Sequence, residues 1–328
     1  MKKLLEMLTY RRPAGSPTER AFIERYIMPF KPKMLAQNLV VVVPGDPGTL
    51  FSCHTDTMHR DHAMQKVVFD ENLGIAWKDD EEPLGADNTA GVWLLLEMLE
   101  AGVPGTYVFH FGEEKGCLGS KQMAKDHAKW LQGFERAIAF DRRGTNSVIT
   151  HQMGDRTCSD TFGHALASAL GGSYECDRTG LYTDTSCYAH LIPECTNVSV
   201  GYEHEHGPME SLDIEHLLWL RDVVLGVNWS SLPTIRAPLE DENLRDRKYN
   251  FGSTKFTGLD YEIGDFEDPT EVERLITLAR MELRDIEDCY ELAEDEPYLL
   301  AQMLYAHLIR VDELEPDKVS HEDATQSE

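Results

Sequence analysis

Apolar and polar residues alternate in short blocks along residues 1–230, in a pattern that predicts strands separated by helices. Short apolar runs flanked by glycine or proline are typical of buried strands. The strands predicted in this way are residues 38–43, 50–53, 106–111, 137–140 and 197–200, with a small hairpin at 67–69 and 74–77. Longer apolar or amphipathic stretches predict helices at 87–99, 121–131, 159–170 and 214–227. Strands and helices that alternate at these lengths predict a layered α/β fold.

The N-terminal segment, residues 1–35, is predicted to be helical with a break at residues 12–17. Ser16 and Glu19 have the spacing of a capping box, and Pro17 stands at the first helical position. We therefore expect a new helix to begin after Ser16.

The chain changes character near Leu232 and Pro233. Residues 231–328 hold 26 acidic and 10 basic side chains, a net charge of −16 within the total of −27. Helical spacing of apolar residues recurs at 272–290, and 298–311 can form a second helix. We predict a catalytic domain at residues 1–231 and an acidic, mainly helical C-terminal extension at 232–328, with a disordered tail from about residue 316.

Composition excludes several classes of partner. A net charge of −27 argues against binding to nucleic acid or to an anionic membrane. No apolar run reaches the roughly 18 residues of a membrane span, and the N-terminus lacks the apolar stretch of a secretory signal. Seven cysteines without a close C-x-x-C pair are typical of a reducing compartment, so we expect a cytoplasmic protein.

Acidic and imidazole side chains follow or adjoin the predicted buried strands. A lone Asp before a helix is ordinarily an N-cap, and two Glu after a strand are ordinarily solvated. Their recurrence at several strand ends is what a metal site at the edge of an α/β sheet needs. The set consists of His54, Asp56, Asp87, Glu113, Glu114, Asp141 and His206.

The first members of this set suit a site for two metals. His54 supplies an imidazole, and Asp56, two residues on and on the same face of a strand, can hold the other ring nitrogen. Asp87 can bridge two ions through its two carboxylate oxygens.

The adjacent acids Glu113 and Glu114 would point to opposite sides if the strand continued through them. One of them can then bind metal while its neighbour addresses a water molecule. Asp141 and His206 complete two ligand sets. Two metals about 3.5–4 Å apart would polarise a carbonyl group for hydrolysis.

The combination of motifs resembles the co-catalytic di-zinc exopeptidases, the clan of leucyl-type bacterial aminopeptidases, glutamyl aminopeptidases, tripeptidases and related deacylases. The resemblance covers roughly residues 1–225. It implies a three-layer α/β/α fold around a mixed, largely parallel sheet. The motifs that carry it are His54-Thr55-Asp56, Gly85-Ala86-Asp87-Asn88, Gly112-Glu113-Glu114-Lys115-Gly116 with Gly119-Ser120, and Asp141, supported by Ala14–Glu19, Thr183-Asp184-Thr185-Ser186 and His206-Gly207-Pro208-Met209-Glu210.

The resemblance also implies roles. One metal would be held by His54, Asp87 and Asp141, and the other by Asp87, Glu114 and His206. His204 competes with His206, which is preferred because Gly207-Pro208 follows it. Two divalent ions are expected, zinc first, with cobalt or manganese as alternatives.

Further roles follow for residues beside the ligands. Glu113 would be the general base that takes a proton from the attacking water and passes it to the leaving amine, while Asp56 orients His54. Asp184 lies in the Thr-Asp segment that precedes the last ligand in several members, and is a candidate for substrate contact. Arg142 is another, because a cation beside a ligand can bind a carboxylate, although a surface pair is an equally good interpretation.

The chain departs from the family in its gaps. Only 30 residues separate Asp56 from Asp87 and 42 separate Asp141 from Asp184, too few for the inserts that many members carry. We expect an aminopeptidase acting on short peptides, without nucleic acid or membrane partners, and we leave room for a homo-oligomer. The alternatives are an N-deacylase or carboxypeptidase on acylated amino acids, and a non-catalytic scaffold that acts through its acidic C-terminus.

Overall fold

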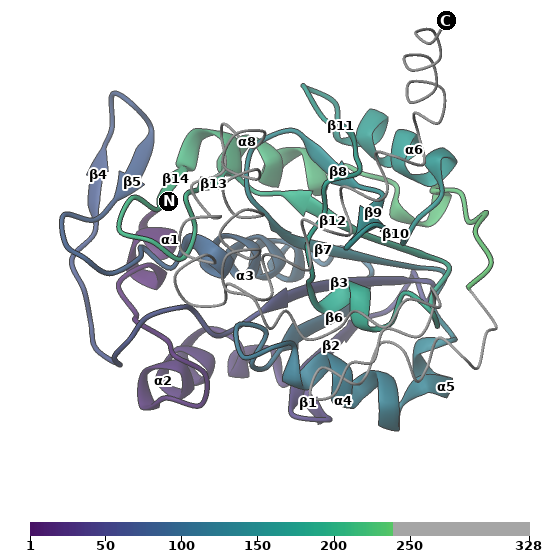
Figure 1. Cartoon of the computed structure of the whole chain (residues 1–328), viewed down its shortest axis with the longest axis horizontal. Coiled ribbons are helices and arrows are strands. Elements are labelled where there is room, and N and C mark those ends of the chain that lie inside the picture. Colours follow the sequence, from purple (N-terminus) through teal and green to yellow (C-terminus); the bar gives the residue numbers. More distant parts are fainter. Residues whose placement is uncertain (239–328) are drawn as a thin grey trace, which may run out of the picture. The chain divides into compact units, whose positions relative to one another are not determined.

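The computed structural model describes residues 1–238, and the helices expected at 272–290 and 298–311 and the tail from about residue 316 lie outside the described residues. The described residues are organised around an eight-stranded sheet (Figure 1). Its strand order is β1-β2-β6-β3-β7-β12-β8-β11. These strands are β1 (Lys33–Leu35), β2 (Asn38–Val43), β3 (Thr49–His54), β6 (Gly105–His110), β7 (Arg136–Arg142), β8 (Ser147–Ile149), β11 (Glu175–Asp177) and β12 (Glu194–Ser199).

The centre of this sheet is parallel. β6 pairs with β3, β3 with β7 and β7 with β12 in parallel, whereas β1, β2 and β6 are joined by antiparallel pairs. Every residue of β3, β6 and β12 is buried, as expected of parallel strands covered on both faces. The predicted mixed, largely parallel sheet is confirmed.

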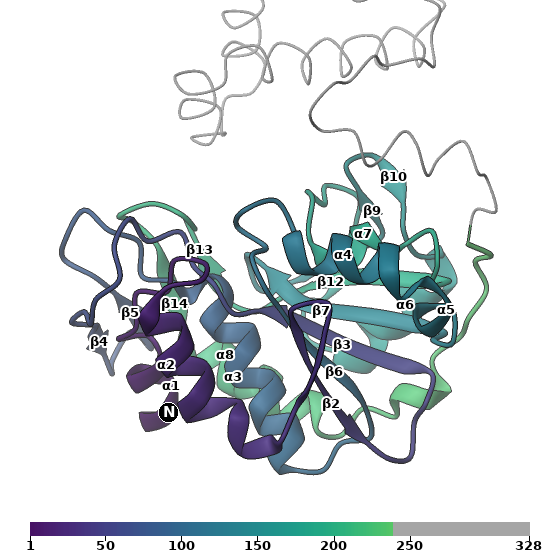
Figure 2. The same cartoon turned by 90° about the horizontal axis from the view of Figure 1, so that it is seen from below.

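Helices cover both faces of the sheet, which gives the expected three layers (Figure 2). Most residues of α3 are buried, because it is enclosed between the sheet and the helices α1 and α8. A second apolar cluster fills the opposite face. The first face carries α1 (Lys2–Met7), α2 (Pro17–Tyr26), α3 (Ala86–Glu100), α6 (Asp160–Leu170) and α8 (Ile214–Val224), and the second carries α4 (Leu118–Asp126), α5 (Ala128–Leu131) and α7 (Asp184–Cys187).

A second, four-stranded sheet in the order β13-β14-β5-β4 adjoins these layers. β4 (Val68–Asp70) and β5 (Ile75–Trp77) form the predicted hairpin. β14 (Ser211–Asp213) pairs with β5 and with β13 (Tyr202–Glu203), so this sheet holds both ends of the loop that contains His206. The remaining short elements are β9 (His151–Gln152), β10 (Asp155–Arg156), η1 (Met28–Phe30) and η2 (Trp229–Ser231).

Two local expectations need correction. Residues 33–35 are a strand and not a helix, because α2 ends at Tyr26 and left-handed Ala36 and Gln37 turn the chain into a hairpin with β2. The helix expected at 121–131 is split where His127 leaves the helical backbone. The predicted cap at Ser16 is confirmed, since its hydroxyl accepts the N–H of Glu19.

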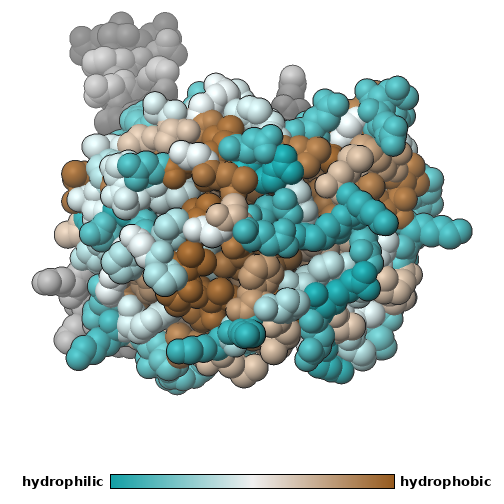
Figure 3. Space-filling view, turned by 180° about the vertical axis from the view of Figure 1, so that it is seen from behind, coloured by the Kyte–Doolittle hydropathy of each residue, from teal (hydrophilic) through white to brown (hydrophobic). Residues whose placement is uncertain are grey.

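The surface seen from behind mixes hydrophilic residues with a hydrophobic area near the middle of that face (Figure 3). Among residues 1–238, no helix is long and apolar enough to cross a membrane.

Candidate active site

The carboxyl ends of β6, β3 and β7 meet at one edge of the large sheet, because these neighbouring strands run parallel. His54 is the last residue of β3 and is aligned with His110, the last residue of β6. Asp141 lies at the end of β7, and Glu113 follows β6 by a short turn. Sheet order therefore brings together residues that lie far apart in the sequence.

Asp87 reaches the same edge from the start of α3. The Asp87–Asn88 peptide bond is cis, and Gly85 before it has a left-handed backbone with φ 73°. Gly91 lets the helix approach β7 closely, because a Cβ atom there would lie 2.0 Å from the carbonyl oxygen of Phe140. The glycine thus places Asp87 over the end of β7.

The first cluster joins His54, Asp87 and Asp141. Nε2 of His54 lies 2.9 Å from Oδ1 of Asp87 and 3.3 Å from Oδ1 of Asp141. All three groups offer ligand atoms within 4.8 Å of one another. This is the first ligand set expected from the sequence.

The second cluster joins Asp87, Glu114 and His206. Nε2 of His206 lies 3.2 Å from Oδ2 of Asp87 and 3.2 Å from Oε1 of Glu114. Asp87 therefore presents one carboxylate oxygen to each cluster. His204 is in none of the candidate metal-binding groups among residues 1–238.

The residues fit divalent cations. An imidazole nitrogen carries at most one proton, so Nε2 of His54 or His206 cannot donate hydrogen bonds to two carboxylates at once. Oε1 of Glu114 is buried, and its contact with His206 lacks hydrogen-bond geometry. Burial alone lowers the pKa of His206, but the charges of Glu114 and Asp87 raise it to about 12. The cluster thus attracts positive charge, and its oxygen and imidazole atoms are zinc-type ligands.

Glu113 belongs to a third group, with His54 and Glu114, whose ligand atoms also lie within 4.8 Å of one another. Its Oε1 accepts a hydrogen bond from the thiol of Cys117 at 3.4 Å. Burial raises the pKa of Glu113 well above its usual range. Burial also raises the pKa of Glu114, to about 7, with the charge of Asp87 adding to the effect.

Asp56 has a wider structural role than the sequence indicated. Its carboxylate oxygens accept the backbone N–H groups of Glu113, at 3.1 Å, and Glu114, at 3.2 Å. Its carbonyl oxygen lies 3.1 Å from Nδ1 of His54. β6 ends at His110, so the two glutamates do not continue the strand, and their positions are set by this clamp.

The two candidates for substrate contact lie in different surroundings. Asp184 is buried, burial raises its pKa well above the usual range, and its Oδ1 has no hydrogen-bond partner among the described residues. Arg142 donates to Oγ1 of Thr179 at 3.2 Å and lies 3.7 Å from Oδ2 of Asp177. The cation of Arg142 is therefore already paired.

Sequence reasoning did not single out Glu210 as a site residue, although it closes the His206–Glu210 motif. Its buried carboxylate accepts the N–H groups of Gly85 at 2.8 Å and Asp87 at 2.9 Å. Burial raises its pKa to about 8. The motif's spacing was the available signal, because its last residue holds the chain at Asp87.

Arg12 and Glu19 were also missed as supports of the site. Arg12 is fully buried and donates to the carbonyl of Thr55 at 2.8 Å and to the hydroxyl of Thr89 at 2.9 Å. Glu19 accepts from the hydroxyl of Thr55 at 2.6 Å. These contacts brace the segment after His54, and no local pattern announces them.

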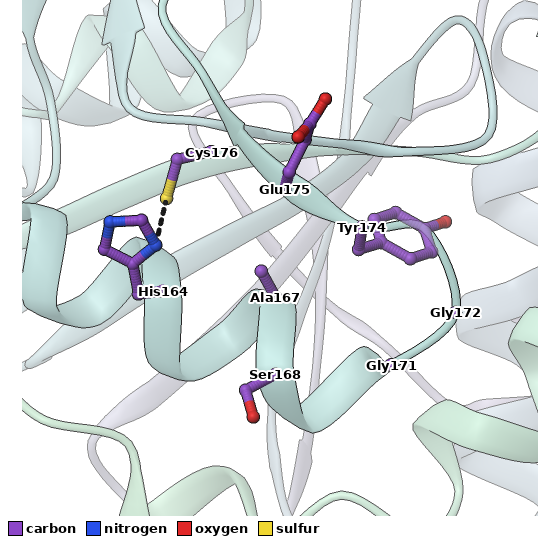
Figure 4. Close-up of a pocket in the computed structure, with 8 residues that line it drawn as sticks. All are labelled: His164, Ala167, Ser168, Gly171, Gly172, Tyr174, Glu175 and Cys176. Atoms are coloured by element: carbon purple, nitrogen blue, oxygen red, sulfur yellow. Dashed lines mark hydrogen bonds between the residues drawn. The ribbon is translucent and has the colours of Figure 1, made fainter.

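A separate hollow lies between α6 and β11 and contains none of the predicted site residues (Figure 4). His164 and Cys176 face each other there at 3.5 Å. The strand-edge clusters, and not this hollow, bring together the residues predicted for the site.

Solved structures with the same fold are peptidases at low sequence identity. An aminopeptidase PepT from Bacillus cereus ATCC 10987 aligns with a TM-score of 0.55 and 13% identity, covering 68% of this chain and 95% of the other. PhTET1-12s, solved as a dodecamer, aligns with a TM-score of 0.51 and 18% identity, and the alignment covers 69% of this chain and 98% of the other. A tripeptidase from Staphylococcus aureus subsp. aureus mu50 aligns with a TM-score of 0.51 and 16% identity, covering 68% of this chain and 95% of the other. No curated protein matches the sequence.

The model of peptidase family M28 matches residues 38–178 of the chain. This match and the fold together indicate a metallo-exopeptidase. That segment contains every predicted metal ligand except His206, and it confirms the resemblance to the co-catalytic zinc exopeptidases.

Proposed function

We propose that the protein is a di-zinc aminopeptidase acting on short peptides. The observation that carries this proposal is the placement of Asp87, whose two oxygens face His54 and His206 separately. A carboxylate shared in this way suits two neighbouring metals. The proposed ligands are His54, Asp87 and Asp141 for one ion and Asp87, Glu114 and His206 for the other, with cobalt or manganese as alternatives to zinc.

The bound metals would polarise the scissile carbonyl and lower the pKa of water. Glu113 takes the proton from the attacking water and delivers it to the leaving amine. A raised pKa suits this role, because the carboxyl group must hold the proton between the two transfers. Asp56 keeps Glu113 in place through its backbone N–H.

The charges around the site favour a substrate with a free amine. Arg142 is paired with Asp177, and Arg143 lies 3.4 Å from Oε1 of Glu205, so both arginines next to Asp141 have acidic partners. A carboxypeptidase or an N-deacylase on acylated amino acids would need such a cation for the substrate carboxylate. The acidic surroundings instead attract an ammonium group.

The test uses metal-loaded full-length protein and a mixed peptide library, read by mass spectrometry. Each peptide is paired with an N-acetylated twin and a C-amidated twin. An aminopeptidase shortens free and amidated peptides from the N-terminus and spares the acetylated ones. If the protein instead shortens acetylated peptides from the C-terminus and leaves amidated peptides intact, it is a carboxypeptidase. If the purified protein binds no metal, the result would favour the alternative of a non-catalytic scaffold that acts through its acidic C-terminus.

The extent of the catalytic domain is also a proposal. Residues beyond the expected boundary at 231 contact the core, since Glu194 accepts the N–H groups of Ile235 at 2.7 Å and Arg236 at 2.9 Å. A truncated catalytic domain should therefore keep residues up to Pro238. We propose that the acidic extension beyond it restricts access to the site.

A cytoplasmic location and self-association complete the proposal. The six cysteines of residues 1–238 carry no disulfide, which suits a reducing compartment. The hydrophobic area in Figure 3 suits a contact between copies of the chain, and size-exclusion chromatography with light scattering would measure it.

A further inference from the structure

The turn that carries Asp87 is held by two groups from different parts of the chain. Glu210, at the end of the loop before β14, accepts the N–H groups of Gly85 and Asp87. The second group is the ring of His59, from the segment after β3, which is only 5% exposed. A Cβ atom on Gly85 would lie 2.7 Å from Cε1 of His59, so the missing side chain of this glycine lets the ring rest against the turn. His59 therefore contacts the chain two residues before the carboxylate that joins the two metal-binding clusters.

Gln65 anchors one edge of the His59 ring. Its amide nitrogen Nε2 donates to the carbonyl oxygens of Leu8 at 2.7 Å and Leu84 at 2.8 Å. Both amide protons are thereby used, and Oε1 of Gln65 is left as an acceptor, 3.0 Å from Nε2 of His59. Nε2 of His59 must therefore carry the ring proton. Because Gln65 also holds Leu84, the residue immediately before Gly85, His59 and Gln65 together support the start of the turn.

The other ring nitrogen of His59 is an acceptor. Its Nδ1 lies 2.8 Å from the hydroxyl oxygen of Thr57. That oxygen accepts the backbone N–H of Arg12 at 2.9 Å, so the hydroxyl proton points to His59. Burial lowers the pKa of His59 to about 3, with the charge of Arg12 adding to the effect, so the ring is neutral and has a single proton. The network therefore fixes the ring in one orientation.

Two other roles for His59 do not fit these contacts. A substrate contact needs a free polar atom, but both ring nitrogens are hydrogen-bonded inside the protein, to Thr57 and Gln65. A metal ligand needs a lone pair directed at the ion, and His59 is in none of the candidate metal-binding groups among residues 1–238. Its contacts lead to the turn before Asp87 instead.

We propose that His59 is a positioning residue for Asp87, acting through its hydrogen bond with Gln65 and its contact with Gly85 to hold the shared carboxylate where two metals can bind it. The inference rests on the proposed role of Asp87 as the bridging ligand. It adds that the affinity for divalent ions depends on a side chain that belongs to neither of the two clusters.

Loss of the ring would remove one of the two supports of the turn. The carboxylate of Asp87 would then sample positions in which an oxygen no longer faces its cluster, and bound ions would have to order the turn themselves. Side chains that orient a metal ligand typically account for about 10–100-fold in metal affinity. We expect a loss of this size when the bond between His59 and Gln65 is removed.

Three substitutions separate the two edges of the ring. His59→Gln extends to the position of Nε2 and can donate to Gln65, whereas His59→Asn stops near the position of Nδ1 and can bond only to Thr57. His59→Ala removes both bonds. The affinity of the metal-free, full-length protein for Zn²⁺ is measured by competition with a chromogenic chelator. His59→Gln should stay close to the wild type, and His59→Asn and His59→Ala should lose about 10–100-fold.

Urea unfolding of the metal-free proteins separates this effect from a general loss of stability. The matched control is His216→Asn, which removes a partly buried ring whose Nε2 lies 3.1 Å from the hydroxyl of Tyr174. It should lower the free energy of unfolding and leave the affinity for Zn²⁺ unchanged. If His59→Ala does not fold, the comparison of His59→Asn with His59→Gln decides the question.

Unchanged affinity in His59→Asn, with only the stability reduced, would overturn the proposal. So would equal losses in His59→Asn and His59→Gln, because the bond to Gln65 would then contribute nothing. If the wild-type protein binds two ions but hydrolyses no peptide, the aminopeptidase function fails alone, and the affinities still decide the role of His59. If it binds no divalent ion, the di-zinc function and this inference both fail.

Discussion

Asp56 accepts the backbone N–H of Glu113 at 3.1 Å, and this contact joins the end of β3 to the turn after β6. The proposed base is therefore positioned by a residue from a neighbouring strand and not by the geometry of its own strand. Groups that hold a catalytic residue in this way commonly affect activity as much as contacts to substrate do.

Replacing this acceptor tests the clamp. Asp56→Asn leaves one oxygen for two backbone N–H groups, and its amide repels one of them. We expect kcat to fall about 10–100-fold with the fold intact. The matched control is Asp46→Asn, because buried Asp46 likewise accepts the N–H of Gly48 and the hydroxyl of Thr49, before β3 begins. Equal losses of activity in the two variants would contradict a specific role for Asp56.

Removal of the shared ligand tests the metal content. The wild-type chain should bind two divalent ions, and Asp87→Ala should lose both, because each cluster contains one of its oxygens. Elemental analysis after gel filtration measures the ratio. Asp160→Ala, an exposed carboxylate on α6, should keep two ions. A single ion in the wild type that survives in Asp87→Ala would rule out the bridged pair.

The adjacent glutamates should separate into two phenotypes. Glu113→Gln should keep both metals yet lose about 10²–10⁴-fold in turnover, because an amide cannot accept the proton. Glu114→Gln should instead weaken metal occupancy, because Glu114 contacts His206 in the second cluster. Metal analysis and kinetics on the same preparations distinguish them, and the opposite result would exchange the two roles.

Stability should depend on pH through His110. Burial lowers its pKa to about 3, and its ring lies between Oδ1 of Asn38 at 3.0 Å and the hydroxyl of Tyr188 at 3.2 Å. In the unfolded chain His110 takes up a proton near pH 6.5, whereas in the folded protein it stays neutral down to about pH 3. The contribution of neutral His110 to the free energy of unfolding is therefore complete above pH 6.5 and is lost as the pH falls toward 3. The free energy of unfolding should lose about 1.4 kcal/mol per pH unit from this residue.

Urea unfolding at several pH values between 7.5 and 5 measures this dependence. His110→Asn should flatten it relative to the wild type, and the exposed His62→Asn should not. Parallel curves for wild type and His110→Asn would show that this histidine is not the source.

Truncation tests the extension. A chain ending at Pro238 keeps the contacts of Ile235 and Arg236 with Glu194 and should fold. We expect it to hydrolyse long unfolded substrates better relative to di- and tripeptides than the full chain does. If the truncated protein keeps the same oligomeric state and the same preference for substrate length, the extension neither restricts access to the site nor contributes to self-association.

The sequence by itself determined the succession of strands and helices and the kinds of residue at the strand ends. Buried strands and capped helices are local patterns, so β2, β3, β6 and β7 and the cap at Ser16 were predictable from spacing. His54, Asp87 and Glu114 stood out because metal ligands at several strand ends rarely coincide by chance.

The tertiary structure alone decided which distant residues meet. The pairing of β3 with β6 brings the carboxylate of Asp56 to the backbone N–H of Glu113. The four-stranded sheet holds the loop that ends at Glu210, whose carboxylate accepts the N–H of Asp87. The motifs mark Asp56 and Glu210 in the sequence, but they do not show which backbone N–H groups these carboxylates bind, because that depends on how the whole chain packs. The same holds for Arg12, which is fully buried and supports the segment after His54 by donating to the carbonyl of Thr55.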